Sequence, residues 1–203
     1  ELPELEKVDD VCEQMEDSKF MEHCYEQFDV NGDGKVSMSE AAALDLSIDC
    51  NTAKSFKGIE YFTNLVSFKS SSVETVNFGY NKKLTSLDCS RAPVTVLDLR
   101  YNTELSNINV SQCTNLTKLL LADEAPMESV LRDTNFNLVG CTALAAVSLP
   151  DNCTVIGGNA FRECTSLVKI KMSACTEIGN NAFYQCSGLT SVTFPESLTK
   201  IGD

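Results

Sequence analysis

A six-residue apolar pattern, Leu-x-x-Leu-x-Leu, recurs along most of the chain at nearly fixed intervals, and this regularity limits the fold more than any other feature. Three copies in the C-terminal part begin at Leu144, Leu167 and Leu189, with offsets of 23 and 22 residues. Five copies in the middle part follow at steps of 11, 10, 11 and 11 residues, beginning at Val73, Leu84, Val94, Leu105 and Leu116. Self-similarity at a fixed period predicts a repeat architecture.

The spacing inside each copy indicates the shape of one coil. The last two apolar residues alternate as on a β-strand, so their side chains fall on one face, and the first residue turns the chain into that strand. A single coil cannot bury its own apolar face, so we expect neighbouring coils to cover it and to stack into a solenoid with a parallel sheet on one face. We expect Phe161 and Phe183 to fill the far side of the coil. Gly157 and Gly179 suit turns that require a positive φ.

Cysteines repeat in the same rhythm. Intervals of 12, 11, 11 and 11 residues separate Cys141, Cys153, Cys164, Cys175 and Cys186. Leu198 stands at the next position of this register, and a position that accepts either Cys or Leu is typical of an apolar core. We therefore predict reduced, buried cysteines, with disulfides and metal ligation as the alternatives. Asn81 and Asn102 occupy the same position in the middle coils, where they can cap backbone groups at a turn.

Negative charge gathers at the N-terminal end. The net charge is -13, and residues 1–50 hold fifteen Asp and Glu against three Lys and Arg. Such a segment suits a cation, whereas nucleic acid is an unfavourable partner because there is no basic stripe to neutralise phosphates. The sequence contains no apolar run long enough to span a bilayer, so we expect no membrane insertion. Because the chain opens with Glu1 rather than Met, we expect that an upstream segment has been removed.

Residues 29–40, Asp-Val-Asn-Gly-Asp-Gly-Lys-Val-Ser-Met-Ser-Glu, match the twelve-residue EF-hand calcium loop at each diagnostic position. The predicted Ca²⁺ ligands are Asp29, Asn31, Asp33, Lys35 through its carbonyl oxygen, Ser37 and Glu40. Gly34 makes the sharp turn, and Val36 packs inward. A lone loop of this kind is expected to bind weakly, with a Kd on the order of 10⁻⁴–10⁻³ M and a structural role. The alternative is a degenerate loop that folds without metal.

The flanks of the loop predict a small helical cap. Phe20, Met21, Cys24 and Phe28 fall on one face of a helix over residues 18–28, and residues 40–43 can form a short helix after the loop. The predicted organisation has four parts: a helical cap with the calcium loop at 1–43, repeats of about 21 residues at 44–121, an insertion at 122–140 with a short helix near 127–132, and repeats of 22–23 residues at 141–203. The predicted class is α+β.

The sequence predicts a binding protein rather than an enzyme. Its one histidine, His23, is expected on the surface of the first helix, where its neighbour Cys24 points about 100° away, so the two do not form a catalytic pair. No phosphate-binding loop occurs. The candidate binding-face residues are those expected to point outward from the repeats: Tyr80, Tyr101, Asp88, Asn107, Asn109, Lys169 and Lys171. The two tyrosines are 21 residues apart, in register on consecutive coils, and packing is their alternative role.

Residues 178–183, 186–195 and 198–202 resemble the BspA-like leucine-rich-repeat family of bacterial surface proteins, and residues 84–90 and 102–105 resemble a shorter repeat class of the same proteins. The resemblance implies a leucine-rich-repeat solenoid that is secreted or displayed on the cell surface. It also implies adhesion to a protein partner, either a host matrix protein or a cell-surface protein. The alternatives are a spacer or recognition arm within a larger surface protein, and a glycan-binding module.

Overall fold

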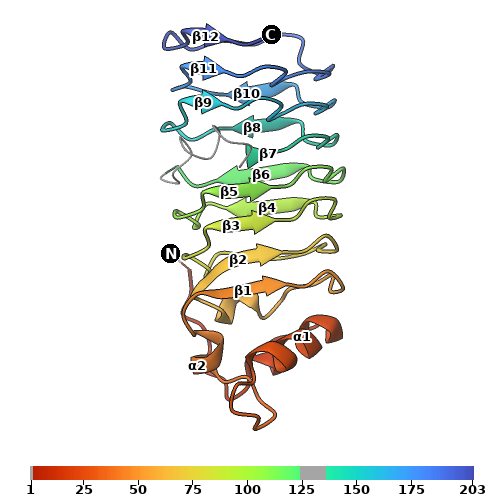
Figure 1. Cartoon of the computed structure of the whole chain (residues 1–203), viewed down its shortest axis with the longest axis vertical. Helices are drawn as coiled ribbons and strands as arrows, with labels where there is room; N and C mark the ends of the chain where they lie inside the picture. The colour runs from red at the N-terminus through yellow and green to blue at the C-terminus, as the bar shows by residue number, and fades with distance from the viewer. Residues whose placement is uncertain (1, 124–135) are drawn as a thin grey trace.

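The computed structural model describes residues 2–123 and 136–203. The chain forms an elongated stack of coils, with short helices at one end and the C-terminus at the other (Figure 1). The helices are α1 (Ser18–Phe28) and α2 (Met38–Ala41), with single 3-10 turns at Val11–Gln14 and Ile59–Tyr61. In the described residues, no helix has the length and apolar character needed to cross a membrane.

Helix α1 closes the N-terminal end of the solenoid core. Its buried face consists of Phe20, Cys24 and Phe28, as the sequence predicts. Phe20 packs against Phe56 of the first coil, with ring centroids 4.8 Å apart, and Phe28 packs against Phe62 at 5.1 Å. The helix therefore covers apolar surface that the first coil would otherwise expose.

Asp17 fastens α1 to that coil through backbone hydrogen bonds. As the N-cap residue, its carboxylate accepts from the N–H groups of Lys19 and Phe20, and it also accepts from Lys54 at 2.8 Å and Ser55 at 3.3 Å. Burial works against ionisation of this carboxyl group, but the four N–H donors outweigh it and lower the pKa of Asp17. One side chain thus satisfies the open end of a helix and the edge of the repeat array.

The described strands form four parallel sheets. The largest holds, in spatial order, β1 (Leu46–Asp49), β2 (Leu65–Lys69), β3 (Ser86–Asp88), β5 (Asn107–Asn109) and β7 (Phe136–Asn137). Two-stranded sheets join β4 (Val96–Leu99) to β6 (Lys118–Leu121), and β8 (Ala146–Ser148) to β10 (Lys169–Lys171). The fourth contains β9 (Val155–Ile156), β11 (Glu177–Ile178) and β12 (Lys200–Ile201).

The expectation of a single sheet on one face is wrong. In the middle coils, β3 pairs with β5 and β4 pairs with β6, so the two apolar triplets of one coil belong to different sheets. The reason is the short step of 10 or 11 residues. A strand and its turn use up half a coil, and only segments a full coil apart can run parallel side by side. Leu87 and Leu97, one from each sheet, are both fully buried in the shared core.

A column of polar side chains caps the turns along the stack, as predicted. The Asn81 amide donates to the carbonyl groups of Ile59 and Phe62, both at 2.9 Å, and the Asn102 amide donates to Phe78 and Asn81. In later coils cysteine thiols replace the amides and donate to backbone carbonyl groups. The pairs are Cys113 with Cys89, Cys141 with Val110, Cys164 with Leu138 and Cys186 with Phe161.

All ten cysteines are free and buried, which confirms the predicted packing role. Burial raises the pKa of Cys164 to about 12 and that of Cys113 to about 12. The expected aromatic packing is also present, since the rings of Phe161 and Phe183 stack with centroids 5.5 Å apart. The thiols of Cys113 and Cys164 therefore remain protonated at neutral pH, where they serve as small donors inside the core.

Two details of the C-terminal coils differ from the sequence-based expectation. The positive φ angles lie at Asn159 (60°), Glu163 (64°), Asn181 (56°) and Gln185 (59°), and not at Gly157 or Gly179. Gly179 is required for another reason, because a Cβ at this position would lie 2.5 Å from the backbone nitrogen of Gly158 in the preceding coil. Close stacking of backbone on backbone, rather than turn geometry, selects this glycine.

Part of the predicted insertion belongs to the solenoid. Within residues 122–140, β7 pairs with β5 and continues the largest sheet. The polypeptide after β7 also bonds to the next coil, through Leu138 N–H to the Ala160 carbonyl at 3.0 Å. The short helix expected near 127–132 lies outside the described residues.

Candidate functional site

The loop after α1 is organised around the Asp29 carboxylate. One of its oxygens accepts from the N–H groups of Gly32 at 2.8 Å and Asp33 at 3.2 Å, and the other accepts from Gly34 at 2.9 Å. Gly34 has a φ of 83°, as its place at the sharp turn requires. The Asn31 side chain accepts from Asp33 N–H at 2.8 Å. These short side chains are held by the backbone of the loop itself.

Glu40 reaches from the end of the loop back to its beginning. Its Oε2 accepts from the Ser37 hydroxyl at 2.7 Å and the Ser37 N–H at 2.9 Å, in the capping box that starts α2. Its Oε1 accepts from Val30 N–H at 3.1 Å and Asn31 N–H at 3.4 Å. The Ser37 hydroxyl, followed by these N–H groups, lowers the pKa of Glu40, which is therefore a carboxylate at neutral pH.

The donor chemistry of this loop fits Ca²⁺. Of the six predicted ligands, Asp29, Asp33 and Glu40 supply carboxylates, and the others supply an amide, a carbonyl and a hydroxyl oxygen. An all-oxygen set on a twelve-residue loop with glycine at the sixth position is what a hard cation of this size requires. Across residues 2–123 and 136–203, no three His, Cys, Asp or Glu side chains lie close enough to hold a metal ion, so the carboxylates point to backbone N–H groups rather than to one centre.

The N-terminal segment packs directly against the loop at 29–40, an arrangement that the sequence did not reveal. Val11 N–H donates to the Val36 carbonyl at 2.9 Å, and Val36 N–H donates to the Asp10 carboxyl at 3.1 Å. Asp10 is 5% exposed and also accepts from Cys12 N–H at 2.9 Å and from the Tyr25 hydroxyl at 2.6 Å. This last hydrogen bond raises the pKa of Tyr25. Asp10 thus ties together the loop, the 3-10 turn and α1.

Asp88, Asn107 and Asn109 lie on the largest sheet. In the register, Asp88 stands between Lys69 on β2 and Asn109 on β5, and Asn109 is followed by Asn137 on β7. Lys69 also forms an ion pair with Asp49 on β1 at 3.0 Å. Asp49, Lys69, Asp88, Asn109 and Asn137 thus form a row of polar side chains on this sheet, one from each coil, and Asn107 stands in a second row beside Ser86.

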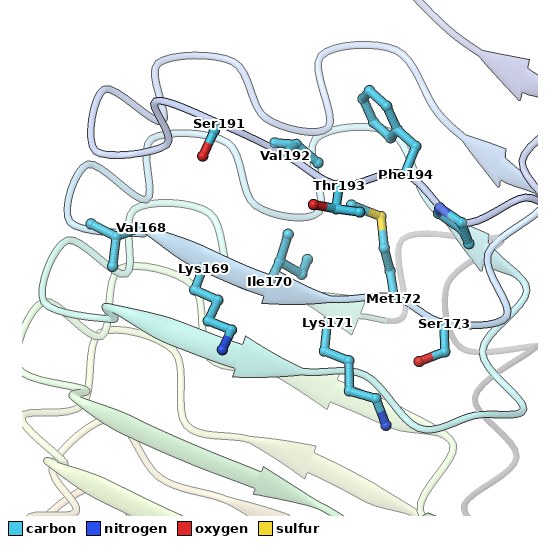
Figure 2. A pocket seen from close by; sticks show the side chains of 11 residues that line it. Val168, Lys169, Ile170, Lys171, Met172, Ser173, Ser191, Val192, Thr193 and Phe194 are labelled. Carbon is cyan, nitrogen blue, oxygen red and sulfur yellow. The ribbon is translucent and has the colours of Figure 1, made fainter.

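Lys169 and Lys171 lie on a different sheet. Figure 2 shows both side chains projecting to the same side of β10, as alternate residues of a strand do. Lys171 pairs with Asp151 at 3.2 Å. Beside β10, residues 191–195 border an open groove of about 660 Å³, and exposed apolar side chains stand on both of its walls, Val168 at 58% and Phe194 at 50%.

Tyr80 and Tyr101 lie on neither sheet. They occupy turns directly before the capping residues Asn81 and Asn102. The Tyr80 hydroxyl donates to the Pro3 carbonyl at 2.8 Å, and Tyr101 is 39% exposed. The seven predicted binding-face residues therefore fall in three places, and the expectation that the strand residues share one sheet is wrong. The cause is again the alternation of triplets between sheets.

The sequence predicts His23 on the surface of α1, but in the structure this residue is half-buried. Its ring packs edge-on against Phe28 at 6.1 Å, and its Nε2 is buried without a hydrogen-bond partner. Burial lowers the pKa of this imidazole, so it is neutral at pH 7. The nearby Cys24 is buried, and burial raises the pKa of its thiol. The pair therefore lacks a reactive thiolate.

The C-terminal repeats are similar to a known repeat family. Residues 112–203 match, in six copies, the family model described as a BspA type leucine rich repeat region. The match covers less than half of the chain. The chain has no match among the curated proteins.

Three solved structures resemble the chain at the level of the fold. They are a leucine-rich repeat protein of T. pallidum (24% identity, 58% of this chain, 41% of that chain, TM-score 0.31), one of Eubacterium ventriosum (22%, 71%, 37%, 0.47) and an internalin of Listeria monocytogenes (15%, 96%, 58%, 0.41). The chain thus spans roughly two to three fifths of their lengths.

Proposed function

We propose that the chain is a non-catalytic binding module, secreted or displayed on the cell surface, that recognises a protein partner through its largest sheet. The observation that carries the proposal is the row formed by Asp49, Lys69, Asp88, Asn109 and Asn137, in which each coil presents one polar side chain in register with the next. Neighbouring positions in such a row are about 4.8 Å apart. A rigid array of this kind can bind a partner with little loss of backbone entropy.

The remaining chemistry favours binding over catalysis. The described thiols are buried, and the one imidazole has a buried nitrogen. A surface or secreted location rests on the resemblance to BspA-like proteins and on the BspA-type repeats at 112–203. Solenoids of this kind present long surfaces to a partner, and their specificity lies in the outward side chains.

Calcium belongs to the same proposal as a structural ion. Bound by the loop, it would join Asp29 at the end of α1 to Glu40 in α2, and it would offset the negative charge of residues 1–50. The expected Kd is on the order of 10⁻⁴–10⁻³ M, the range of extracellular calcium modules. The support for this part is the oxygen donor set and the turn at Gly34.

A binding screen tests the proposed surface. Immobilised extracellular-matrix and cell-surface proteins are probed with the wild-type chain by biolayer interferometry. An Asp88→Lys, Asn109→Lys variant should weaken a saturable interaction by about tenfold or more, since it places charge in the centre of the row. A Lys169→Glu, Lys171→Glu variant, altered on the other sheet, is the matched control and should bind normally. No saturable partner, or equal loss in both variants, would refute the assignment of this face.

A further inference from the structure

The N-terminal segment, residues 2–8, passes beside the solenoid and leaves a crevice of about 850 Å³ between them. This volume lies within the range of small-molecule and cofactor sites, roughly 300–1,000 Å³. Its walls include Lys7 of the segment, Met38 of α2, and Tyr80, Lys82, Lys83 and Tyr101 of two consecutive coils. The crevice shares no residue with the polar row on the largest sheet, and of residues 29–40 only Met38, which is not a predicted Ca²⁺ ligand, lines it.

The segment that forms the outer wall is fixed at both ends. At one end, the Pro3 carbonyl accepts from the Tyr80 hydroxyl at 2.8 Å, and Leu2 lies so near Gly79 that a Cβ there would be 3.3 Å from its side chain. At the other end, Asp10 is held by three hydrogen-bond donors. Residues 4–9 therefore bridge two anchored points, and the crevice is a built feature rather than a gap beside a loose terminus.

Positive charge collects in this crevice although the chain as a whole is acidic. Lys83 is neutralised by Glu104 at 2.6 Å. Lys7 and Lys82 have no ion-pair partner among residues 2–123 and 136–203, and both are exposed. Glu4 is the one acidic residue among the residues that line the crevice. The two unpaired ammonium groups of Lys7 and Lys82 outnumber this one carboxylate, and the excess of positive charge favours an anionic ligand.

The inner wall of the crevice carries aromatic and polar side chains. Tyr80 and Tyr101 come from equivalent turns one coil apart, and Tyr101 keeps 39% of its surface exposed. Thr63 and Asn64 add a hydroxyl and an amide beside them. Flat rings with a polar edge, next to hydrogen-bonding side chains, suit a ligand with apolar C–H faces and many hydroxyl groups.

We propose that this crevice binds an acidic oligosaccharide, one whose sugar rings carry carboxylates. The sugar rings pack on Tyr80 and Tyr101, and the carboxylates meet the ammonium groups of Lys7 and Lys82. A neutral glycan would leave both lysines unused, and an acidic peptide would leave the paired rings without a flat surface to cover. The site does not depend on the proposed protein-binding face or on calcium.

Isothermal titration with a galacturonic-acid hexamer tests the site, with a neutral cellulose hexamer and a hexaglutamate peptide as comparison ligands. The galacturonate should bind saturably and the other two weakly. A Lys7→Glu, Lys82→Glu variant should lose about fivefold or more in affinity, because two exposed ion pairs are together worth about 1 kcal/mol or more. Tyr101→Ala should also weaken binding, since it removes one stacking surface.

The matched control is Lys118→Glu, Lys169→Glu, which makes the same change of charge at two exposed lysines on other strands. It should leave galacturonate affinity within about twofold. No saturable binding, equal binding of the neutral hexamer or the peptide, or an equal loss in the control variant would overturn the proposal. Circular dichroism of each variant establishes that it is folded. The Asp88→Lys, Asn109→Lys variant should bind galacturonate normally, which separates this site from the sheet row.

Discussion

Replacing Asp10 with alanine should loosen the loop at 29–40 and the helical cap together. The substitution removes the acceptor for three donors: Cys12 N–H at 2.9 Å, Val36 N–H at 3.1 Å and the Tyr25 hydroxyl at 2.6 Å. A buried donor left unpaired costs about 1–3 kcal/mol. Val36 is fully buried and its N–H loses its partner, so the expected cost for the cap is about 3–5 kcal/mol.

A graded series sharpens this prediction. Tyr25→Phe removes only the hydroxyl donor and should cost about 1 kcal/mol. Asp10→Asn keeps one oxygen for the two N–H groups, so its cost should fall between that of Tyr25→Phe and that of Asp10→Ala. Asp9→Ala changes the exposed neighbouring carboxylate and is the matched control, with an effect within about 0.5 kcal/mol.

Hydrogen exchange at the Val36 amide is the suitable assay, because a solenoid need not unfold in one step. A loss of about 3 kcal/mol corresponds to a roughly hundredfold faster exchange through opening of the cap. The calcium affinity of Asp10→Ala should fall as well, since the loop must first be reordered. If Asp10→Ala exchanges at the wild-type rate, or if Tyr25→Phe is the more damaging change, the idea that Asp10 holds the loop is incorrect.

Three further results are expected. Calcium titrated into EDTA-treated protein should bind at one equivalent and raise the melting temperature, whereas Glu40→Gln should abolish both effects. Glu40→Gln should also lose less stability than the wild type as the pH falls. The lowered pKa of Glu40 contributes stability that is present above the ordinary pKa of 4.5 and is lost as the pH falls through the folded-state pKa. An unchanged dependence of stability on pH in acid would contradict this. Asn102→Ala should cost about 2–3 kcal/mol in urea unfolding by orphaning two carbonyl groups, and Asn102→Cys less, since later coils use a thiol there. In the folded protein at pH 8 none of the ten cysteines should react quickly with a thiol reagent, and rapid labelling of any one would show that it is accessible.

The sequence predicts features that depend on local pattern. Helix α1 and the caps at Asn81 and Asn102 follow from residue types at fixed spacing, and the structure places each as expected. The calcium loop predicted at 29–40 from the same kind of spacing stays a prediction. The role of Asp10 could not be found in this way, because its partners Tyr25 and Val36 lie 15 and 26 residues away. Only the position of Asp10 before two apolar residues, as the cap of a 3-10 turn, gives a local signal.

The division of the strands among separate sheets could not be predicted from the sequence. The triplets beginning at Leu84 and Val94 have the same spacing, so the sequence shows no difference between them. The structure assigns them to separate sheets because a half-coil must turn back before the next one begins. For the same reason Asp88 and Lys169 fall on different surfaces. Nor does the pattern predict the crevice, since it depends on where residues 2–8 pass beside the coils.

The direction of the inter-coil hydrogen bonds determines how the molecule responds to force. Bonds such as Ser70 to Asp88, Cys89 to Asn109 and Val110 to Asn137 join successive coils along the long axis (Figure 1). Tension between the two ends therefore loads the coils one after another, and they peel apart in sequence rather than shearing together. A coil of 21 residues stacks in about 4.8 Å but extends to about 70 Å once released. Held at one end and pulled at the other, the array would lengthen in steps of roughly 65 Å, absorbing work while the remaining coils stay folded.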